Sequence, residues 1–263
     1  MQKMIGYMRK AVQDYQMLQD GDRVAVGVSG GKDSLVTLLG LARLRQFLGV
    51  DFSLTAVTVD PGFGGKPGNY GEIRALCEEN GIPYLVKQTQ IGPIIFDIRK
   101  ESNPCALCAK MRRGSLHDAA KEAGCNKLAL GHNYDDAVET FVMNLFNEGR
   151  IGCFSPVTYL SRKDITVLRP LIYAPEREVR AAARRLELPV VSSACPADKN
   201  TNRQQIKEWL SAMEREHKGI KQRLFGAFCR YGVDGWREPG SYQKELLLRR
   251  LAGPRQGTEE PAD

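Results

Sequence analysis

A glycine-rich turn near the N-terminus carries residues suited to binding phosphate. It reads Ser29-Gly30-Gly31-Lys32-Asp33-Ser34 and lies between an apolar run, residues 24–28, and a segment with apolar residues at helical spacing. Two glycines let backbone N–H groups close on phosphate oxygens, and a helix N-terminus adds positive potential. Lys32 adds a full charge, so we expect this turn to bind the phosphates of a nucleotide.

The turn differs from a Walker A loop. That pattern, G-x-x-x-x-G-K-[ST], would need Gly where Val26 stands and Ser or Thr where Asp33 stands. ATP hydrolysis in the ordinary P-loop manner is therefore disfavoured. The alternative is a plain glycine turn, and the strand-turn-helix context together with Lys32 argues against it.

Two thiols open a later segment with helical spacing. Cys105 and Cys108 are separated by two residues, with Arg112 and Arg113 one turn beyond. At a helix N-terminus such thiols can bind one centre, and the helix dipole favours their thiolate form. A closed zinc site would need four ligands, but no second C-x-x-C or H-x₃₋₅-H pair exists. Cys195 offers a third sulfur, and three thiolates suit an iron–sulfur cluster with one open iron better.

The other four cysteines stand singly in helical, turn or apolar settings. They are interpreted as small core residues rather than ligands: Cys77, Cys125, Cys153 and Cys229.

A third group of polar residues follows a predicted strand at 127–130. It reads Gly131-His132-Asn133-Tyr134-Asp135-Asp136. Ligands of an open α/β sheet sit at this edge of the strands, where carboxylates can hold Mg²⁺ or orient a substrate. For Asp135, a role as the N-cap of the following helix is an equally good interpretation.

The elements that must position these residues alternate along the chain. Strands are predicted at 24–28, 54–59, 84–88 and 127–130, and helices from Ser34 to Gly49, at 70–80 and at 108–123. A parallel α/β sheet is implied. Glycines and prolines interrupt the alternation after residue 150, and helical patterns resume at 176–186, 203–216 and 220–231. We predict an α/β nucleotide-binding domain at 1–175, a basic helical region at 176–252 and a disordered tail at 253–263.

Composition limits the class of protein. With 42% hydrophobic and 26% charged residues, the chain is typical of globular proteins and unlike a disordered, collagen or coiled-coil chain. The excess of 38 Lys and Arg over 31 Asp and Glu favours a polyanionic partner, nucleic acid first, with a solvated basic face as the alternative. No signal peptide is recognised, and no apolar run approaches the roughly 18 residues of a membrane span. We expect no membrane partner and a cytoplasmic protein with reduced cysteines.

The S-G-G-K-D-S turn resembles the PP-loop of the ATP pyrophosphatase superfamily. That resemblance implies an adenine nucleotide alpha hydrolase-like, Rossmann-like fold. It also implies that residues 29–34 and Gly131 bind ATP, with Mg²⁺ on the β,γ-pyrophosphate. AMP would be transferred to a carbonyl oxygen of the substrate, and pyrophosphate released. A carbonyl oxygen leaves badly, so acquiring AMP makes later attack by a nucleophile feasible.

Over residues 4–230 the motifs resemble, in family order, the TtcA-type tRNA 2-thiocytidine synthetases. The resemblance implies that Cys105, Cys108 and Cys195 hold a [4Fe–4S] cluster and that sulfur replaces the C2 oxygen of cytidine 32 in tRNA. It makes Arg112 and Asp136 candidates for managing charge or protons at the reacting base, beside Cys105 and Cys108. A cysteine desulfurase or another sulfide donor would supply sulfur, and a homodimer is compatible with the family.

Several alternatives stay open. Ser192-Ser193-Ala194 stands where family members often carry a further cysteine, and His132-Asn133 is closer to the tRNA 2-thiouridine synthetases. Those enzymes usually carry terminal zinc fingers, which this chain lacks. Lysidine synthetases share the loop but lack the three cysteines. Amidotransferase relatives need a glutaminase domain. A non-enzymatic Fe–S or zinc RNA-binding protein would leave Lys32 and Asp33 without a role. Sulfur could also travel as a persulfide on Cys105 or Cys108, with no iron.

Overall fold

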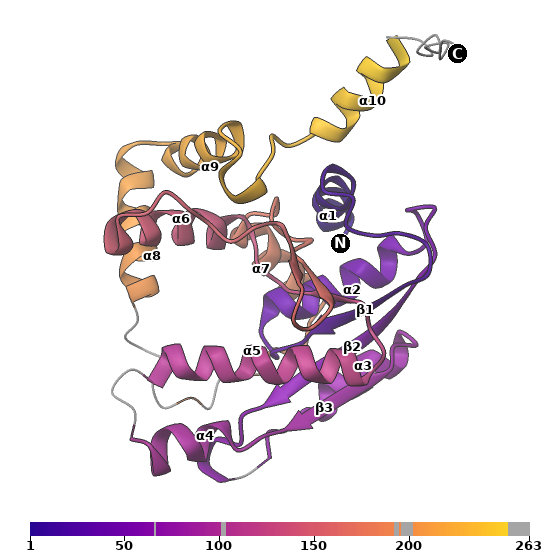
Figure 1. Ribbon diagram of the computed structural model, residues 1–263, viewed down its shortest axis with the longest axis vertical. Coiled ribbons are helices and arrows are strands. Elements are labelled where there is room, and N and C mark those ends of the chain that lie inside the picture. Colours follow the sequence, from indigo (N-terminus) through magenta and orange to yellow (C-terminus); the bar gives the residue numbers. More distant parts are fainter. Residues whose placement is uncertain (66, 101–103, 192–194, 196–201, 252–263) are drawn as a thin grey trace, which may run out of the picture.

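One six-stranded sheet organises the part of the chain that the computed structural model describes, residues 1–65, 67–100, 104–191, 195 and 202–251 (Figure 1). The strands are β1 (Asp22–Gly27), β2 (Phe52–Asp60), β3 (Tyr84–Gln88), β4 (Lys127–Ala129), β5 (Val157–Leu160) and β6 (Ile165–Leu168). Their order is β3-β2-β1-β4-β6-β5, and only the β5–β6 pair is antiparallel. The predicted α/β fold with a mostly parallel sheet is confirmed.

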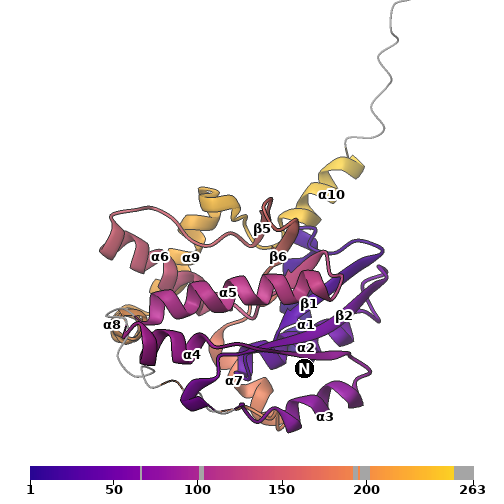
Figure 2. The ribbon, with the colours of Figure 1, turned by 60° about the horizontal axis from the view of Figure 1, so that its bottom comes forward.

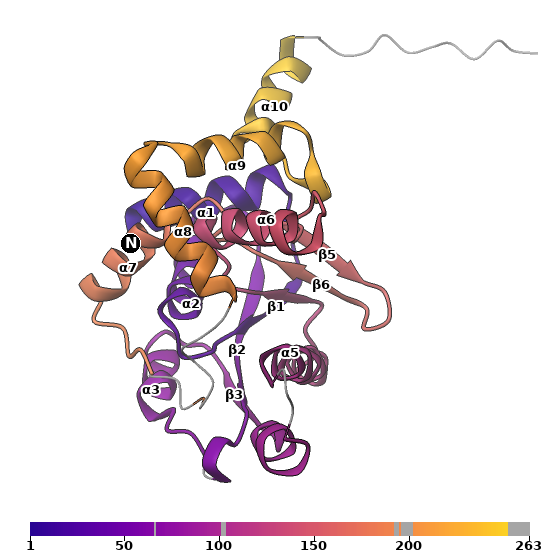
Figure 3. The same ribbon diagram turned by 90° about the vertical axis from the view of Figure 1, so that its left-hand side faces the viewer.

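The central strands are apolar on both faces because helices cover both faces. In β1, Val24 and Val26 join the larger core with α2 (Lys32–Leu44), whereas Ala25 joins a second core with α5 (Pro104–Glu122). Figures 2 and 3 show α5 along one face of the sheet and α2, α3 (Gly71–Glu79) and α7 (Glu176–Arg185) along the other.

The strand order reverses at β1, which lies between β2 and β4. The loops that follow β1 and β4 therefore leave the sheet at neighbouring points of the same edge. This is the position at which open α/β sheets bind ligands.

The remaining helices lie around this unit. They are α1 (Gln2–Asp14), α4 (Ile91–Pro93), α6 (Tyr134–Glu148), α8 (Asn202–Glu216), α9 (Ile220–Arg230) and α10 (Ser241–Leu251), with short helical turns at Phe63–Gly65, Ile94–Ile98 and Val233–Gly235. α1 and α7 pack against α2, and α8 and α9 pack against α6, while α10 projects from the body (Figure 1).

The structure differs from the sequence prediction at several elements. The stretch after residue 150, interpreted as irregular, contains the hairpin of β5 and β6 that extends the sheet. Its strands have only four residues each, so their alternation is too short to stand out among glycines and prolines. α1 and α10 were not predicted, and α5 begins at Pro104, so Cys105 and Cys108 lie in its first turns.

The division of the chain at residue 175 stays a prediction, and the expected tail at 253–263 lies outside the described residues. Among the helices that the structure describes, none is both long and apolar enough to cross a membrane.

Candidate active site

The 29–34 loop joins β1 to α2. Ser34 holds it closed, because its hydroxyl accepts a hydrogen bond from the Ser29 N–H (3.1 Å) and donates one to the Gly31 carbonyl (2.8 Å). Gly30 has a φ of +82°, in the left-handed region that favours glycine. α2 begins at Lys32, so the first N–H groups of the helix face the loop. Backbone donors around a helix N-terminus form an anion site.

The loop after β4 packs directly on this turn. A Cβ on Gly131 would stand 2.8 Å from the carbonyl carbon of Asp33 and 2.9 Å from the nitrogen of Ser34, so only glycine fits. Two residues on, the Asn133 side chain donates a hydrogen bond to the Asp33 carboxylate at 3.1 Å. The two predicted ligand segments are thus brought together by backbone contact.

Asn133, not Asp135, caps α6. The Asn133 side chain accepts a hydrogen bond from the Asp136 N–H, and the Asp136 carboxylate accepts one from the Asn133 N–H. The interpretation of Asp135 as the cap is therefore wrong. Its carboxylate instead accepts hydrogen bonds from the Lys221 ammonium and the Glu176 N–H, both at 2.7 Å.

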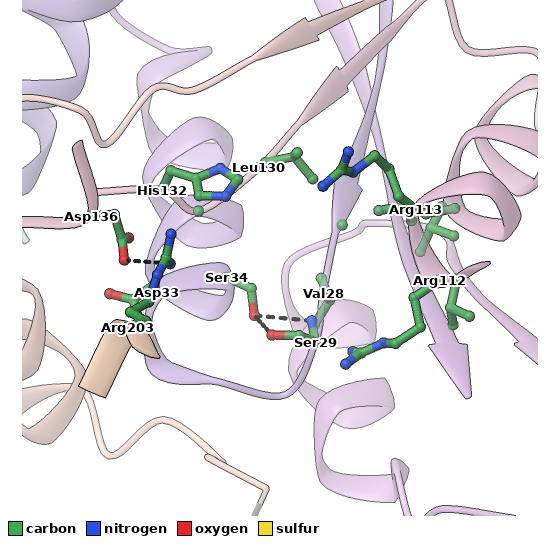
Figure 4. Close-up of a pocket in the computed structure, with 15 residues that line it drawn as sticks. Val28, Ser29, Asp33, Ser34, Arg112, Arg113, Leu130, His132, Asp136 and Arg203 are labelled. Carbon is green, nitrogen blue, oxygen red and sulfur yellow. Dashed lines mark hydrogen bonds and ion pairs between the residues drawn. The ribbon is translucent and has the colours of Figure 1, made fainter. Parts of the chain in front are cut away.

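A cavity of about 370 Å³ opens beside the 29–34 loop (Figure 4). One part of its wall is apolar, with Val57, Val59, Leu116 and Leu130. The other part is polar and is formed by Ser29, Asp33, Ser34, Arg112, Arg113, Gly131, His132, Asp136 and Arg203. An apolar slot next to an anion site suits a nucleotide, whose base is flat and uncharged and whose phosphates are anionic.

Lys32 is held by two carboxylates at the start of α2. Its ammonium lies 2.9 Å from Asp33 and 3.0 Å from Glu176. Burial alone would lower the pKa of Lys32, but hydrogen bonds and charge from these carboxylates outweigh burial and raise it. The lysine therefore carries its charge beside the loop.

Asp136 and His132 show how desolvation sets charge in the cavity. Burial raises the pKa of Asp136, although the Asn133 N–H and Arg203, 3.4 Å from its carboxylate, act the other way. Burial, aided by Arg169 and Arg203, lowers the pKa of His132 to about 3. At neutral pH the His132 imidazole is therefore uncharged. The Asp136 carboxylate binds a proton more tightly than an ordinary aspartate does.

The three cysteines of interest come from two segments. Cys105 is exposed, Cys108 is buried and Cys195 is partly exposed. The thiols of Cys105 and Cys195 both lie within electrostatic range of Cys108 and raise its pKa. Across the described residues, no group of three or more His, Cys, Asp and Glu side chains is close enough to hold a metal ion as it stands.

The expectation of a low-pKa thiol fails for Cys108. Burial raises the pKa of Cys108, and Arg112, which lowers it, is not enough to offset burial. Because α5 starts at Pro104, Cys108 lies in its second turn rather than at its first N–H groups, where the helix dipole acts most strongly.

Sequence reasoning missed three residues near the loop. Glu176 binds Lys32, Lys207 of α8 binds Glu176 at 2.7 Å, and Glu139 of α6 is buried near Asp136. Glu139 had a signal, since a charged residue interrupts the apolar positions of α6. Lys207 had none, because it is one of many basic residues in its region.

A family model described as a PP-loop domain matches residues 4–213. Curated relatives include two proteins named tRNA-cytidine(32) 2-sulfurtransferase. The one from Pelobacter propionicus is 41% identical over 83% of this chain and 81% of its own length. The one from Syntrophotalea carbinolica is 40% identical over 83% of this chain and 85% of its own length.

A similar solved structure is that of a U34-tRNA thiolase, NcsA, from Methanococcus maripaludis with its [4Fe-4S] cluster. It is 28% identical to this chain and superposes with a TM-score of 0.72, over 92% of this chain and 88% of the thiolase. The likeness extends beyond the sheet to nearly the whole chain.

Proposed function

The chain belongs to the PP-loop family, in the group of the curated tRNA-cytidine(32) 2-sulfurtransferases, and on that premise we propose that it is an ATP-dependent tRNA thiolation enzyme. It adenylates the C2 carbonyl oxygen of a tRNA pyrimidine, cytidine 32 first, and exchanges that oxygen for sulfur, releasing AMP and pyrophosphate. The observation that carries the proposal is the course of α5. This helix bears Cys105 and Cys108 in its first turns, and its Arg112 and Arg113 line the cavity beside the 29–34 loop.

The two parts of the cavity wall suit the two ends of ATP. The adenine lies on the apolar wall of Val57, Val59, Leu116 and Leu130, and the phosphates lie on the backbone of the 29–34 loop. Asp33 is the carboxylate of the cavity that would hold Mg²⁺, which binds proteins through one or two carboxylates plus phosphate oxygens. The ion would neutralise charge that develops on the leaving pyrophosphate.

The chain's own cations act on the reacting groups. Arg112 and Arg113 reach the cavity from α5, where their charges favour the negative charge that builds up as the base is adenylated. Asp136 is suited to exchange a proton with the base, because burial raises its proton affinity while it stays in contact with the cavity.

Cys105, Cys108 and Cys195 are the residues that would hold a [4Fe–4S] cluster. Their chemistry fits, since three thiols, with those of Cys105 and Cys195 each within electrostatic range of Cys108, match a three-thiolate ligand set. When bound, such a cluster supplies an open iron that accepts sulfide. The rival use of these thiols is a persulfide, for which the exposed Cys105 is the better carrier.

The tRNA binds through the arginines of α7. Arg177, Arg180 and Arg184 line a groove of about 690 Å³ that is also lined by Lys221 of α9 and by Asp135, Glu176 and Glu214. Such a row of cations follows a phosphate backbone. A cysteine desulfurase or another sulfide donor supplies sulfur in the cytoplasm. The basic helical region from residue 176 is the tRNA-binding part of the chain.

The test combines product analysis with nucleoside analysis. The anaerobically purified chain, given tRNA, ATP and sulfide, is expected to release AMP and pyrophosphate and to form 2-thiocytidine, as mass spectrometry of tRNA digests would show. Lys32→Ala, which removes a cation from the loop and little from the core, should lose activity and keep its fold. ADP and phosphate as the main tRNA-dependent products would contradict the proposal.

A second candidate is thiolation of uridine 34, favoured by the likeness to the U34-tRNA thiolase. The same digests distinguish the two, because 2-thiouridine would appear in place of 2-thiocytidine. A deletion strain that loses one of these nucleosides identifies the base in the cell.

A further inference from the structure

A groove of about 580 Å³, here called the α1–α2 groove, lies at the end of α2 that is opposite to the 29–34 loop. Residues of α1, of the end of α2 and of the turns after α2 and α3 line it: Gln2, Ile5, Ala42, Arg43, Arg45, Gln46, Phe47 and Asn80. α2 has 13 residues, so at 1.5 Å per residue the groove is about 20 Å from the loop. Its lining residues are all different from those of the nucleotide cavity.

The charges of the α1–α2 groove are all positive among the described residues that line it. The sequence explains this, because residues 1–13 and 34–50 contain five basic residues and no Asp or Glu: Lys3, Arg9, Lys10, Arg43 and Arg45. Arg43 and Arg45 are exposed, and neither forms an ion pair with any described residue. Two guanidinium groups without a carboxylate partner create a local positive field that favours a polyanion.

An exposed aromatic ring accompanies the two arginines. Phe47 follows the end of α2 and is 65% exposed. A single exposed ring would need no explanation by itself, but this one shares its groove with two guanidinium groups and three side-chain amides. Cations for phosphates, a ring for stacking and amides for base edges are the groups with which proteins bind unpaired RNA. An acidic peptide would match the arginines but offers no flat base for the ring.

Lys3 connects the α1–α2 groove with the groove lined by the arginines of α7. Lys3 follows Gln2, which lines the α1–α2 groove, and its ammonium binds Glu178 of α7 at 2.6 Å. Arg177, next to Glu178, lines the groove of α7. Figure 3 shows the start of α1 beside α7. A polyanion that lies along α7 can therefore continue past Lys3 into the α1–α2 groove.

We propose that the α1–α2 groove extends the tRNA-binding surface, with Arg43 and Arg45 binding backbone phosphates and Phe47 stacking on an unpaired base. The inference rests on the proposed function for the identity of the RNA. Guanidinium groups suit phosphates because they donate two parallel hydrogen bonds. A strand that advances about 3.4 Å per nucleotide needs about six nucleotides to span the distance from the 29–34 loop. The groove therefore holds a part of the tRNA other than the base that is thiolated.

The test is binding of an unmodified tRNA transcript to the full chain, purified anaerobically, over a salt series. Arg43→Ala and Arg45→Ala should each weaken binding several-fold and reduce the slope of the salt dependence by about 1, because each removes one phosphate contact. Phe47→Ala should weaken binding by about tenfold and leave the slope unchanged, because stacking on a base displaces no counterion. Phe47→Trp, which keeps an aromatic ring, should bind as tightly as wild type.

Arg162→Ala and Tyr231→Ala are the matched controls for the arginine and aromatic variants. Arg162 is exposed in the turn between β5 and β6, Tyr231 is 81% exposed after α9, and both are outside the groove. Both variants should bind tRNA as wild type does. At saturating tRNA, the groove variants should keep the wild-type kcat and the wild-type KM for ATP, since their side chains are remote from the nucleotide cavity.

Two results would overturn the inference. One is wild-type tRNA affinity in Phe47→Ala, or a wild-type salt slope in both arginine variants. The other is a wild-type dimer in sedimentation that Phe47→Ala converts into a monomer with unchanged tRNA affinity, which would assign the groove to contact between two copies of the chain.

Failure of the proposed function gives a different result. A chain that thiolates no tRNA but binds it through Arg43, Arg45 and Phe47 keeps the groove assignment. A chain that forms thiolated tRNA while binding it independently of these three residues loses only the groove assignment.

Discussion

Asn133 holds Asp33 by a 3.1 Å hydrogen bond that joins the loop after β4 to the first turn of α2. The same side chain caps α6 by accepting the Asp136 N–H. The side-chain N–H of Asn133 therefore orients Asp33 in the nucleotide cavity. Its side-chain oxygen fixes the start of α6, the helix that carries Asp136, another carboxylate of that cavity. Asparagine does both because it has a donor and an acceptor on one short side chain.

Replacing Asn133 separates these two tasks. Ser is as good an N-cap as Asn but cannot offer the same amide donor, so Asn133→Ser should keep most of the stability and raise the KM for ATP several-fold. Asn133→Ala loses both tasks and should also lose about 1 kcal/mol of unfolding free energy. Steady-state kinetics and urea unfolding measure the two effects. An unchanged KM in the Ser variant would show that the amide does not position Asp33 for ATP.

Gly131 is predicted to be irreplaceable for a steric reason. A Cβ at this position would stand 2.8 Å from backbone of Asp33, which cannot move without displacing the 29–34 loop. Gly131→Ala should therefore weaken ATP binding and lower stability by about 1–3 kcal/mol. Gly226→Ala, in α9 with open space around its Cβ, is the control and should be neutral or stabilising. ATP titrations and thermal unfolding of both variants provide the comparison.

Glu139 is predicted to make the fold less stable as pH rises. Burial raises the pKa of Glu139 from its usual 4.5 to about 7. Between these values the folded chain holds a proton that the unfolded chain releases, so the free energy of unfolding falls as pH rises and the full penalty is present above about pH 7. Glu139→Gln should match wild type near pH 4.5 and exceed its stability by on the order of 3 kcal/mol at pH 8.

Urea unfolding at pH 5 and pH 8 measures this difference. Glu148→Gln, at the exposed end of α6, is the control and should change the stability at pH 8 far less than Glu139→Gln does. An equal gain for Glu139→Gln at both pH values would mean that its carboxyl group does not titrate in this range.

The central strands and the 29–34 loop could be predicted from the sequence because each is encoded by a short, local pattern of apolar and glycine residues. β3 has the predicted bounds, 84–88, and the 29–34 loop follows β1 and opens α2 as expected. The approach of residues 131–136 to that loop also followed from a rule, since both segments leave parallel strands at the same edge of the sheet.

Long-range pairs could not be predicted in the same way. The contact of Lys207 with Glu176 depends on how α8 packs over α6 and on where α7 starts, and neither is encoded in a local pattern. Burial of Cys108 could not be predicted from the sequence either. The sequence placed this thiol near the start of a helix, but its pKa is raised because the side chain is buried.

Binding of tRNA is predicted to depend steeply on salt. If the arginines of α7 contact phosphates, the logarithm of the association constant should fall linearly with the logarithm of salt concentration. Arg184→Ala should weaken binding of all tRNAs alike and reduce the slope by about 1. Lys163→Ala, in the turn between β5 and β6, is the control outside the groove. Filter binding over a salt series measures both, and salt-insensitive affinity would favour a small-molecule substrate.

The cysteines are predicted to act as one ligand set. After anaerobic reconstitution, Cys105→Ala, Cys108→Ala and Cys195→Ala should each lose most of the iron, the absorbance of the cluster and the thiolation activity, because a cluster with one open iron has no spare protein ligand. Cys125→Ala, which removes a buried thiol just after the end of α5, should keep its iron. If Cys195→Ala retains full iron and activity while the other two variants lose activity, sulfur instead travels as a persulfide on Cys105 or Cys108.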